Sequence, residues 1–574
     1  MPVRWLSQSN DNYEALSRFG VGGNQWTKWA RNPKAYEQLI QTSLRNGVSL
    51  LEVAGPEGGE LALANAYRQV VLNNPDLLPS TTSSSIPPLT VTTRIGYRTI
   101  ASPSDGTDTN DESKQPPPRY DGDVVVEEAH SQKLSDTRGE EGDIVIHNLS
   151  QNYIQQKIES IPPLVQLGMD FPDHVRIVYL IHNPEAQVLQ LLRDEQEVEL
   201  APLERRQEYI QQRLSDAMEG LEAVVAKGLV HSYGVVSNGL GLPAHHALHL
   251  SPTTLLNLSS PSTRYGNFTT VQLPLNLLET GSKEAIAAIH DASSKNQSSI
   301  TNIYAMRPLM SYPDLGTGTA LPLELVDFSA SRNSLGASAG SNDDQDGSTS
   351  DPKNDLVYTN QWHGPPSMYQ VALQTALSHF DADPILELQA KGEKLTTEQR
   401  ETLEGCKLFQ SMLHDLDVKL ENVSSFAAHE QELYQKIIPL IYDSFEEVDE
   451  STSQVLQAFF VAYGLAVRYQ IASKTRQLLT PTKAKKDKDQ DDSEAEESSS
   501  ESSEETATKE SSPDSSSTRK YDIPSDMTLQ EYAFRFVLKD PAISRVIVGA
   551  SSIDEFVEDL RFISKIHVQD DKGK

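Results

Sequence analysis

The chain has 574 residues, of which 37% are hydrophobic, and a formal net charge of −33. This acidic excess repels nucleic-acid phosphates and anionic membrane surfaces, so we expect neither as a partner. A single cysteine, Cys406, excludes an intrachain disulfide and fits a reducing compartment. The sequence shows no apolar run of about 18 residues and no apolar signal core in its first residues, so we expect a cytoplasmic location. An organelle presequence is the alternative.

Short runs of β-branched or apolar residues predict the strands of this chain. They lie at residues 19–21, 48–53, 89–94, 176–182, 230–237, 269–273, 300–306 and 545–548. Helical patterns separate most of these runs. Residues 33–45 and 207–227, for example, each place apolar side chains at three- and four-residue spacing.

Strands that alternate with helices predict a parallel sheet, and eight such units predict an α/β fold of the (β/α)8 TIM-barrel type. An open, doubly wound sheet is the alternative. The Gly-rich GVGG at residues 20–23 follows a strand, but Gln25 stands where the dinucleotide fingerprint needs a third glycine.

Several insertions interrupt the barrel pattern. Residues 356–479 are helical in pattern, with no strand between, and we expect a subdomain inserted between the seventh strand and the last barrel helix. It packs against the barrel, or it acts as a lid or a partner-binding surface. Residues 101–142, 329–355 and 480–520 are polar enough to predict disorder. The barrel then comprises residues 1–100, 143–328 and 521–574.

The last of the polar segments, residues 480–520, is acidic and rich in serine. A solvated linker is the first interpretation. The alternative is a phosphorylated tail that docks a protein partner.

Several stretches together resemble the aldo-keto reductase family. They are YLIHNPE at residues 179–185, GVVSN at 234–238, LPLNLLE at 273–279 and VIVGASS at 546–552. The resemblance covers about residues 16–100, 143–327 and 521–566, and is closest to the branch that carries HNPE after the fourth strand. It implies a nicotinamide cofactor across the C-terminal mouth of the barrel and hydride transfer to or from a small carbonyl substrate.

The family catalyses this step with a tyrosine, a lysine paired with an aspartate, and a histidine. The histidine matches His182. The aspartate falls on Glu52, the tyrosine on Glu57 and the lysine on Arg94. We expect Glu52 and Arg94 to form a bidentate ion pair. Glu57 would repel the oxyanion that develops on the substrate, unless burial kept it protonated. The resemblance therefore implies lost or altered carbonyl reduction.

The resemblance also assigns a cofactor site. Ser237 and Asn238 match the pair that holds the carboxamide, Gln272 matches its partner, and Arg307 lies at the turn after the seventh strand, where Met306 replaces a stacking tyrosine.

At the other end of the cofactor, the phosphate-binding loop falls on Gly549, Ala550 and Ser551. Glu555 and Asp559 stand where the family has an arginine and an asparagine. Two acids at the ribose 2′-phosphate disfavour NADP, so NAD is the expected cofactor.

No metal site is expected. His245 and His249 in HHALH could face one metal on a helix, but no cysteine or H-E-x-x-H ligand set accompanies them. Two functional hypotheses follow. The first is an NAD(P)-dependent aldo-keto reductase-like oxidoreductase with lost or altered chemistry. The second is a non-catalytic barrel that serves as a dinucleotide-sensing or protein-interaction scaffold.

Overall fold

A computed structural model describes most of the predicted barrel and part of the insertions. The described residues are 18–22, 32–53, 59–77, 88–100, 123–126, 144–189, 191, 202–311, 323–325, 365–422, 450–479, 521–524, 527–550 and 553–572. All statements below concern these residues.

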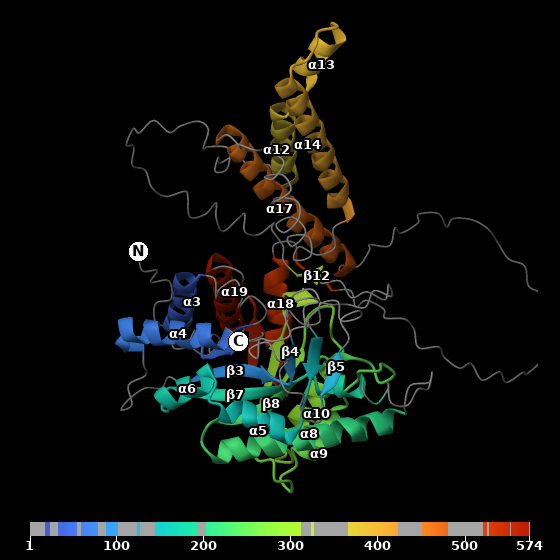
Figure 1. Ribbon diagram of the computed structural model, residues 1–574. Coiled ribbons are helices and arrows are strands. Elements are labelled where there is room, and N and C mark those ends of the chain that lie inside the picture. The colour runs from blue at the N-terminus through green and yellow to red at the C-terminus, as the bar shows by residue number, and fades with distance from the viewer. Residues whose placement is uncertain are drawn as a thin grey trace, which may run out of the picture. The chain divides into compact units, whose positions relative to one another are not determined.

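Eight parallel strands form a closed barrel (Figure 1). In barrel order of the chain they are β1 (Phe19–Val21), β2 (Leu50–Val53), β3 (Leu89–Ile95), β7 (Val175–His182), β8 (Ser232–Val236), β9 (Phe268–Pro274), β10 (Asn302–Met306) and β13 (Arg545–Val548). Each coincides with a predicted strand to within two residues. The predicted (β/α)8 TIM barrel is confirmed.

Helices connect consecutive strands on the outside of the barrel. They are α3 (Pro33–Arg45), α4 (Gly59–Asn73), α5 (Gln151–Glu159), α6 (Pro163–Asp170), α8 (Leu203–Ala226), α9 (Pro252–Leu258), α10 (Lys283–Ser294), α18 (Leu529–Leu538) and α19 (Ile553–Lys572). Short 3-10 turns are η1 (Pro75–Leu77), η3 (Pro184–Gln187) and η4 (Gly239–Gly241). In Figure 1, α5 and α8 run side by side.

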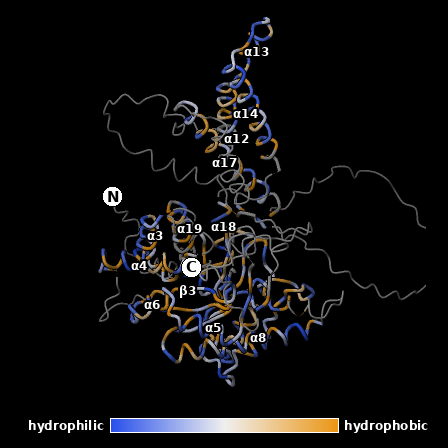
Figure 2. The backbone as a smooth tube through the Cα atoms, in the orientation of Figure 1, coloured by the Kyte–Doolittle hydropathy of each residue, from blue (hydrophilic) through white to orange (hydrophobic). Residues whose placement is uncertain are grey.

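Local sequence explains where these helices begin and which face they bury. In α3, Asn32 is the N-cap and its side chain accepts a hydrogen bond from the Ala35 amide, with Pro33 at the first helical position. The helix buries Tyr36, Leu39 and Ile40 against the barrel. Figure 2 shows that hydrophobic and hydrophilic residues alternate along α8, which also buries one face.

Strand periodicity divides the barrel residues into two sets. On β7, Ile177, Tyr179 and Ile181 belong to the large cluster between strands and helices, whereas Val178 and Leu180 form a separate cluster with Val236 and Met306. Successive strand side chains point to opposite faces, so His182 continues the inward-facing set. The same rule places polar residues from three other strands inside the C-terminal end of the barrel: Glu52 on β2, Arg94 on β3 and Gln272 on β9.

A second sheet corrects one prediction. Strands β4 (Tyr97–Ile100), β6 (Ile144–His147) and β5 (Val124–Val126) form a three-stranded antiparallel sheet. Residues 101–142 were predicted to be disordered, but Asp123 to Val126 within them are ordered, and β5 pairs with β6. The polar composition on both sides hid a three-valine run whose hydrogen-bonding partner lies about 20 residues further along the chain.

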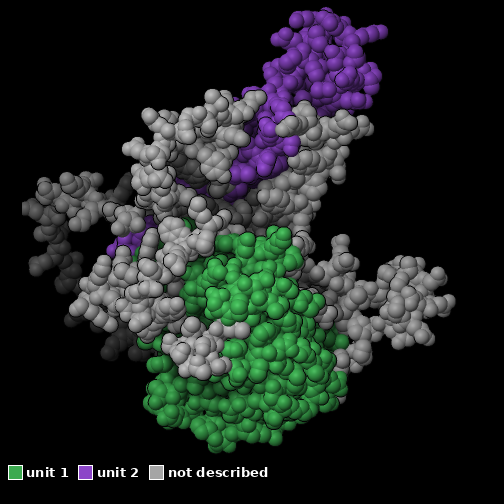
Figure 3. All heavy atoms as spheres, turned by 90° about the vertical axis from the view of Figure 1, so that its left-hand side faces the viewer, with its two compact units in different colours: residues 1–312, 530–574 green, residues 313–529 purple. Residues whose placement is uncertain are grey.

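The helical insertion follows β10, as predicted. Residues 313–529 form a compact unit separate from residues 1–312 and 530–574 (Figure 3). This unit contains α12 (Pro365–His379), α13 (Asp383–Ala390), α14 (Thr397–Asn422) and α17 (Glu450–Leu479), and the short strands β11 (Met310–Ser311) and β12 (Leu323–Glu324) lie to either side of its start in sequence. A predicted helix at residues 430–448 lies outside the described residues. The exact domain boundaries and a partner for this insertion stay predictions.

The core of the insertion is formed by aromatic and aliphatic residues of α12, α14 and α17, including Phe409, Phe459 and Tyr463. Among the described residues, one helical segment, Ser451–Arg476, has the length and hydropathy to cross a membrane, with a mean hydropathy of 1.3. It is 53% buried inside the protein. A core helix passes the same test, and here the helix supplies Phe459 and Tyr463 to a protein core.

Candidate active site

An ion pair lies inside the C-terminal end of the barrel. Arg94, the last inward-facing residue of β3, donates from Nη2 and Nε to Glu52 Oε1 on β2, at 3.2 and 3.3 Å. Gln272 Nε2 on β9 donates to the same oxygen at 2.7 Å. Glu52 is 1% exposed. The expected Glu52–Arg94 pair is present, but both Arg94 donors share one carboxylate oxygen, so the expected bidentate, two-oxygen geometry is wrong. Gln272 takes part because its Nε2 also needs a buried acceptor.

The same guanidinium contacts the histidine. Arg94 Nη1 lies 3.2 Å from His182 Nε2. Arginine has only donors, so His182 Nε2 must be the acceptor and carries no proton. Burial, and then the charge of Arg94, hold the pKa of His182 well below its usual value. His182 is therefore a neutral imidazole whose Nε2 lone pair is already engaged.

The second sheet places two further rings beside His182, and neither was selected from the sequence. Gly96, with φ of 132°, lets the chain turn from β3 into β4. Tyr97 then packs edge-on against His182, with ring centroids 4.9 Å apart, and against His147 at 4.4 Å. Burial raises the pKa of Tyr97, and its phenol hydrogen-bonds the side chain of Asn183.

His147 is fixed by its own partners. Its Nε2 donates to the His182 backbone oxygen at 2.8 Å, and its Nδ1 accepts from Gln187 Nε2 at 2.7 Å. Burial lowers the pKa of His147 to about 4. This ring thus supports the end of β7 and is neutral at physiological pH. His147 was not selected from the sequence, because neither β6, on which it lies, nor the neighbouring strand β5 was predicted.

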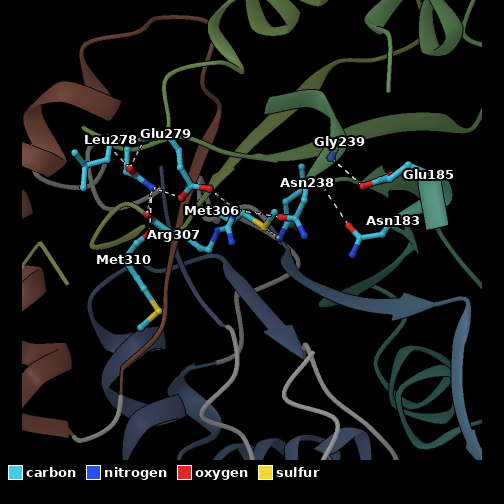
Figure 4. Close-up of polar contacts among 11 residues, drawn as sticks. Asn183, Glu185, Asn238, Gly239, Leu278, Glu279, Met306, Arg307 and Met310 are labelled. Atoms are coloured by element: carbon cyan, nitrogen blue, oxygen red, sulfur yellow. Dashed lines mark hydrogen bonds and ion pairs between the residues drawn. The ribbon is translucent and has the colours of Figure 1, made fainter. Parts of the chain in front are cut away.

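A third cluster follows β8 (Figure 4). Ser237 Oγ donates to Glu185 Oε2 at 2.9 Å, and the Gly239 amide donates to Glu185 Oε1 at 2.8 Å. The Asn238 amide donates to Asn183 Oδ1 at 3.2 Å. Burial raises the pKa of Glu185 from 4.5 to about 7, against the opposing effect of these donors. Sequence reasoning noted HNPE but did not select its glutamate.

Arg307 orients the Asn238 side chain. In Figure 4, Arg307 Nη2 donates to Asn238 Oδ1 at 3.1 Å and to Glu279 Oε1 at 2.8 Å. Arg307 has a positive φ of 60°, and Asn276 Nδ2 donates to its backbone oxygen at 3.2 Å. Since Arg307 holds the amide oxygen of Asn238, the Asn238 Nδ2 group is the end that remains for a ligand. Glu279 is a further residue that the sequence reasoning missed.

The side chain of Gln272 is fixed in the same way. Its Nε2 donates to Glu52, so a flipped amide would bring two oxygens together. Its Oε1 is buried and has no hydrogen-bond partner among the described residues. A buried acceptor without a donor is costly and calls for an explanation.

At the end of β13, the predicted phosphate loop is described only in part. Gly549 is exposed and Ala550 is buried, next to the start of α19, while Ser551 lies outside the described residues. Asp559 on α19 is 3% exposed, and its Oδ2 has no partner among the described residues. Burial, and then Glu555 and Glu558, raise the pKa of Asp559 well above its usual value. These effects favour the neutral form of the carboxyl.

Two other sequence predictions concern Glu57 and the HHALH segment. Glu57, the residue at the family's tyrosine position, lies outside the described residues. The HHALH segment forms turns, so the helical spacing assumed for His245 and His249 is wrong. There, His249 Nδ1 contacts the Leu242 backbone oxygen at 2.6 Å. Groups of three acidic, histidine or cysteine side chains that could hold a metal were not found among the described residues.

Comparison with known proteins adds little to this geometry. No family model and no curated protein matches the chain. Two solved structures from Pseudomonas aeruginosa, both provisionally described as aldo-keto reductases, are similar to it at 13% identity. Each match covers 51% of this chain and 74% of the other, with TM-scores of 0.26 and 0.27. Similarity at this level says nothing about ligand or activity.

Proposed function

We propose that this barrel binds a nicotinamide dinucleotide across its C-terminal mouth, as aldo-keto reductases do, and that ordinary carbonyl reduction is lost or altered. The observation that carries the proposal is the buried Gln272 Oε1, which has no hydrogen-bond partner among the described residues. The Gln272 backbone oxygen accepts a hydrogen bond from the Ser237 amide at 3.0 Å. Bound nicotinamide would supply hydride chemistry. The chain's own residues would bind the carboxamide, orient the ring and exclude water.

The hydrogen-bonding polarity of the three side chains complements a carboxamide. Its carbonyl needs one donor and its amino group needs two acceptors. Asn238 offers Nδ2, because Arg307 holds its oxygen. Gln272 offers Oε1, because Glu52 holds its nitrogen. Ser237 offers oxygen lone pairs, because its proton goes to Glu185. Ser237 and Gln272 are fully buried, so binding requires an opening in front of them.

The tetrad positions support loss of the standard reaction. Reduction of a carbonyl needs a proton donor near the oxygen on which negative charge develops. His182 Nε2 accepts from Arg94 instead of presenting an N–H, and by sequence the tyrosine position holds Glu57. Arg94 holds its proton permanently and cannot share it as a tuned lysine can.

We propose NAD as the preferred dinucleotide, with a revised physical reason. Repulsion of a 2′-phosphate by both Glu555 and Asp559 was the sequence argument. Because burial favours the neutral form of Asp559, Glu555 is the main source of the repulsion. NADH should bind more tightly than NADPH in a fluorescence titration, and Glu555→Arg should reverse the order. Tighter NADPH binding by the unmodified protein would contradict the preference.

The proposed function is tested in two steps. Calorimetric titration with NAD⁺ should show saturable binding that weakens at least about tenfold in Asn238→Ala, as loss of a buried hydrogen bond predicts. Asn302→Ala, at the opposite end of the barrel strands, is the matched control and should bind as the unmodified protein does. Absence of binding in the unmodified protein rejects the proposal.

The second step concerns catalysis. The double variant Glu57→Tyr, Arg94→Lys should gain NADH-dependent reduction of a panel of aldehydes and ketones, while the unmodified protein shows none. Robust reduction by the unmodified protein, abolished in Glu57→Gln, would show that the chemistry is altered rather than lost.

A further inference from the structure

A buried carboxylate contacts Ser237, one of the residues that we propose bind the nicotinamide carboxamide. Glu185, on η3, is 3% exposed, and its two oxygens accept from Ser237 Oγ and from the Gly239 amide. Both donors are neutral, and no ion pair to Glu185 occurs in the described part of the chain. Burial of a carboxylate without a cation is expensive, so its retention at this position calls for a role beyond packing.

We infer that Glu185 is a positioning residue, which acts through the Ser237 hydroxyl and makes the site selective for an unsubstituted carboxamide. The inference rests on the proposed function, since it concerns how the same site recognises nicotinamide. Glu185 itself does not contact the ligand, because Ser237 lies between them in the hydrogen-bond chain.

The Ser237 hydroxyl can donate only one hydrogen bond. A serine hydroxyl has one proton and two lone pairs. While Glu185 accepts that proton, the oxygen can only accept from a ligand, and the carboxamide amino group is a donor. If the Ser237 proton pointed at the ligand instead, two donors would face each other across a dry site. An unpaired buried donor costs enough to remove the preference for an amide.

Replacement of the carboxylate by an amide would turn the Ser237 proton toward the ligand and remove the preference. The Gly239 amide is a fixed donor, so the oxygen of a glutamine at position 185 must face it. The glutamine amino group would then face Ser237 Oγ, which must accept and turn its own proton elsewhere. Protonation of Glu185 has the same effect, because a carboxylic acid that accepts from Gly239 can donate to Ser237.

The groups around Glu185 keep one charge state through neutral pH. Tyr97, on β4, stays protonated because burial raises its pKa, and His182 and His147 stay neutral because burial lowers theirs. Arg206, on α8, which packs against η3, donates to the backbone oxygens of His246 and Ala247. Glu185 itself has a pKa of about 7. It is therefore the group that changes charge between pH 6 and 8.

The test compares two ligands that differ at one group. In 3-acetylpyridine adenine dinucleotide a methyl replaces the carboxamide amino group, so the carbonyl remains and the two donors are lost. By calorimetry at pH 8, the unmodified protein should bind NAD⁺ at least about tenfold more tightly than the analogue. In Glu185→Gln the ratio should fall to within about twofold. ADP-ribose, which lacks the ring, should bind both proteins equally.

Two variants separate positioning from a general structural effect. Glu222 also accepts from neutral donors, the Tyr233 hydroxyl and the Asn267 side chain, at the opposite end of the barrel. Glu222→Gln should keep the tenfold ratio. Ser237→Ala should lower the ratio by itself, and Glu185→Gln should cause no further change in that background, because its effect passes through the missing hydroxyl.

The outcomes are distinguishable. A ratio that stays near tenfold in Glu185→Gln overturns the inference and leaves dinucleotide binding intact. Failure of the unmodified protein to bind NAD⁺ overturns the proposed function and the inference with it. If Glu185→Gln does not fold, the unmodified protein decides, since its ratio should fall severalfold between pH 8 and pH 6. A ratio that is constant over this range overturns the inference.

Discussion

Arg94 Nη1 and His182 Nε2 are 3.2 Å apart, and the arginine must be the donor. This one contact fixes the tautomer of the imidazole, with its proton on Nδ1. It also joins Glu52, Arg94 and His182 into a single chain of hydrogen bonds across three neighbouring strands. A lysine ammonium is a single donor point on a flexible stem, whereas the guanidinium fork can contact both neighbours at once.

The contact predicts how His182 titrates. Replacement of Arg94 by glutamine should raise the pKa of His182, because the Arg94 charge is the second cause, after burial, of its lowered value. Two-dimensional NMR of the imidazole nitrogens measures this pKa. His147 is the internal control, because only burial lowers its pKa, and it should stay near 4. An unchanged His182 titration would mean that the two side chains are not in contact in solution.

The ion pair also predicts a stability effect. Arg94→Met leaves Glu52 buried without its cation, which should destabilise the barrel by about 3 kcal/mol. Adding Glu52→Gln should restore much of the loss, because the uncompensated charge is then removed. Urea unfolding followed by circular dichroism gives both values from the transition midpoints. Equal midpoints for Arg94→Met and the unmodified protein would contradict a buried pair.

The barrel could be predicted from the sequence because its signals are local. All eight strands are short β-branched or apolar runs. Period-two alternation brings residues such as Glu52, Arg94 and His182 to the same inner face once the barrel is assumed. The pairing of Glu52 with Arg94 followed from the resemblance, which puts these opposite charges at the positions of the family's paired aspartate and lysine. The additional contact from Arg94 to His182 did not, because it depends on the length of a side chain across two strands.

Other parts of the site depend on non-local structure that a sequence pattern does not reveal. Tyr97 and His147 reach His182 through an antiparallel sheet whose third strand, β5, lies within a polar segment. Glu185 was not selected from the sequence, because its burial and its contact with Ser237 depend on how η3 packs. The raised pKa of Asp559 likewise arises from burial, which the sequence alone could not measure.

Gly22, which follows β1, packs against Glu52 of the ion pair and leaves no room for a side chain. A Cβ on Gly22 would lie 2.4 Å from Glu52 Cβ and 2.9 Å from its Oε2. Gly22→Ala should therefore displace Glu52 and destabilise the protein by about 1–3 kcal/mol, as overpacking does. Gly266→Ala is the matched control, because nothing lies within 4 Å of its Cβ position. Thermal unfolding of both variants compares them. A Gly22→Ala transition no lower than that of Gly266→Ala would show that Glu52 does not occupy this position.

The raised pKa of Glu185 predicts a pH dependence of stability with a definite sign. Its pKa rises from 4.5 in the unfolded chain to about 7 in the fold. Between these values the folded protein binds a proton that the unfolded chain has lost, so stability falls as the pH rises from about 4.5 to 7. A shift of this size corresponds to roughly 3 kcal/mol at and above neutrality, at 1.36 kcal/mol per unit.

Glutamine at position 185 removes this titration. Subtracting the urea unfolding free energies of Glu185→Gln from those of the unmodified protein, at half-unit steps from pH 4.5 to 8, isolates the contribution of Glu185, because all other groups cancel. The difference should change by roughly 3 kcal/mol across the window, with the unmodified protein relatively less stable at the higher pH. A flat difference for Glu185→Gln would mean that the carboxylate is solvated, and that it does not hold the Ser237 hydroxyl in a dry site.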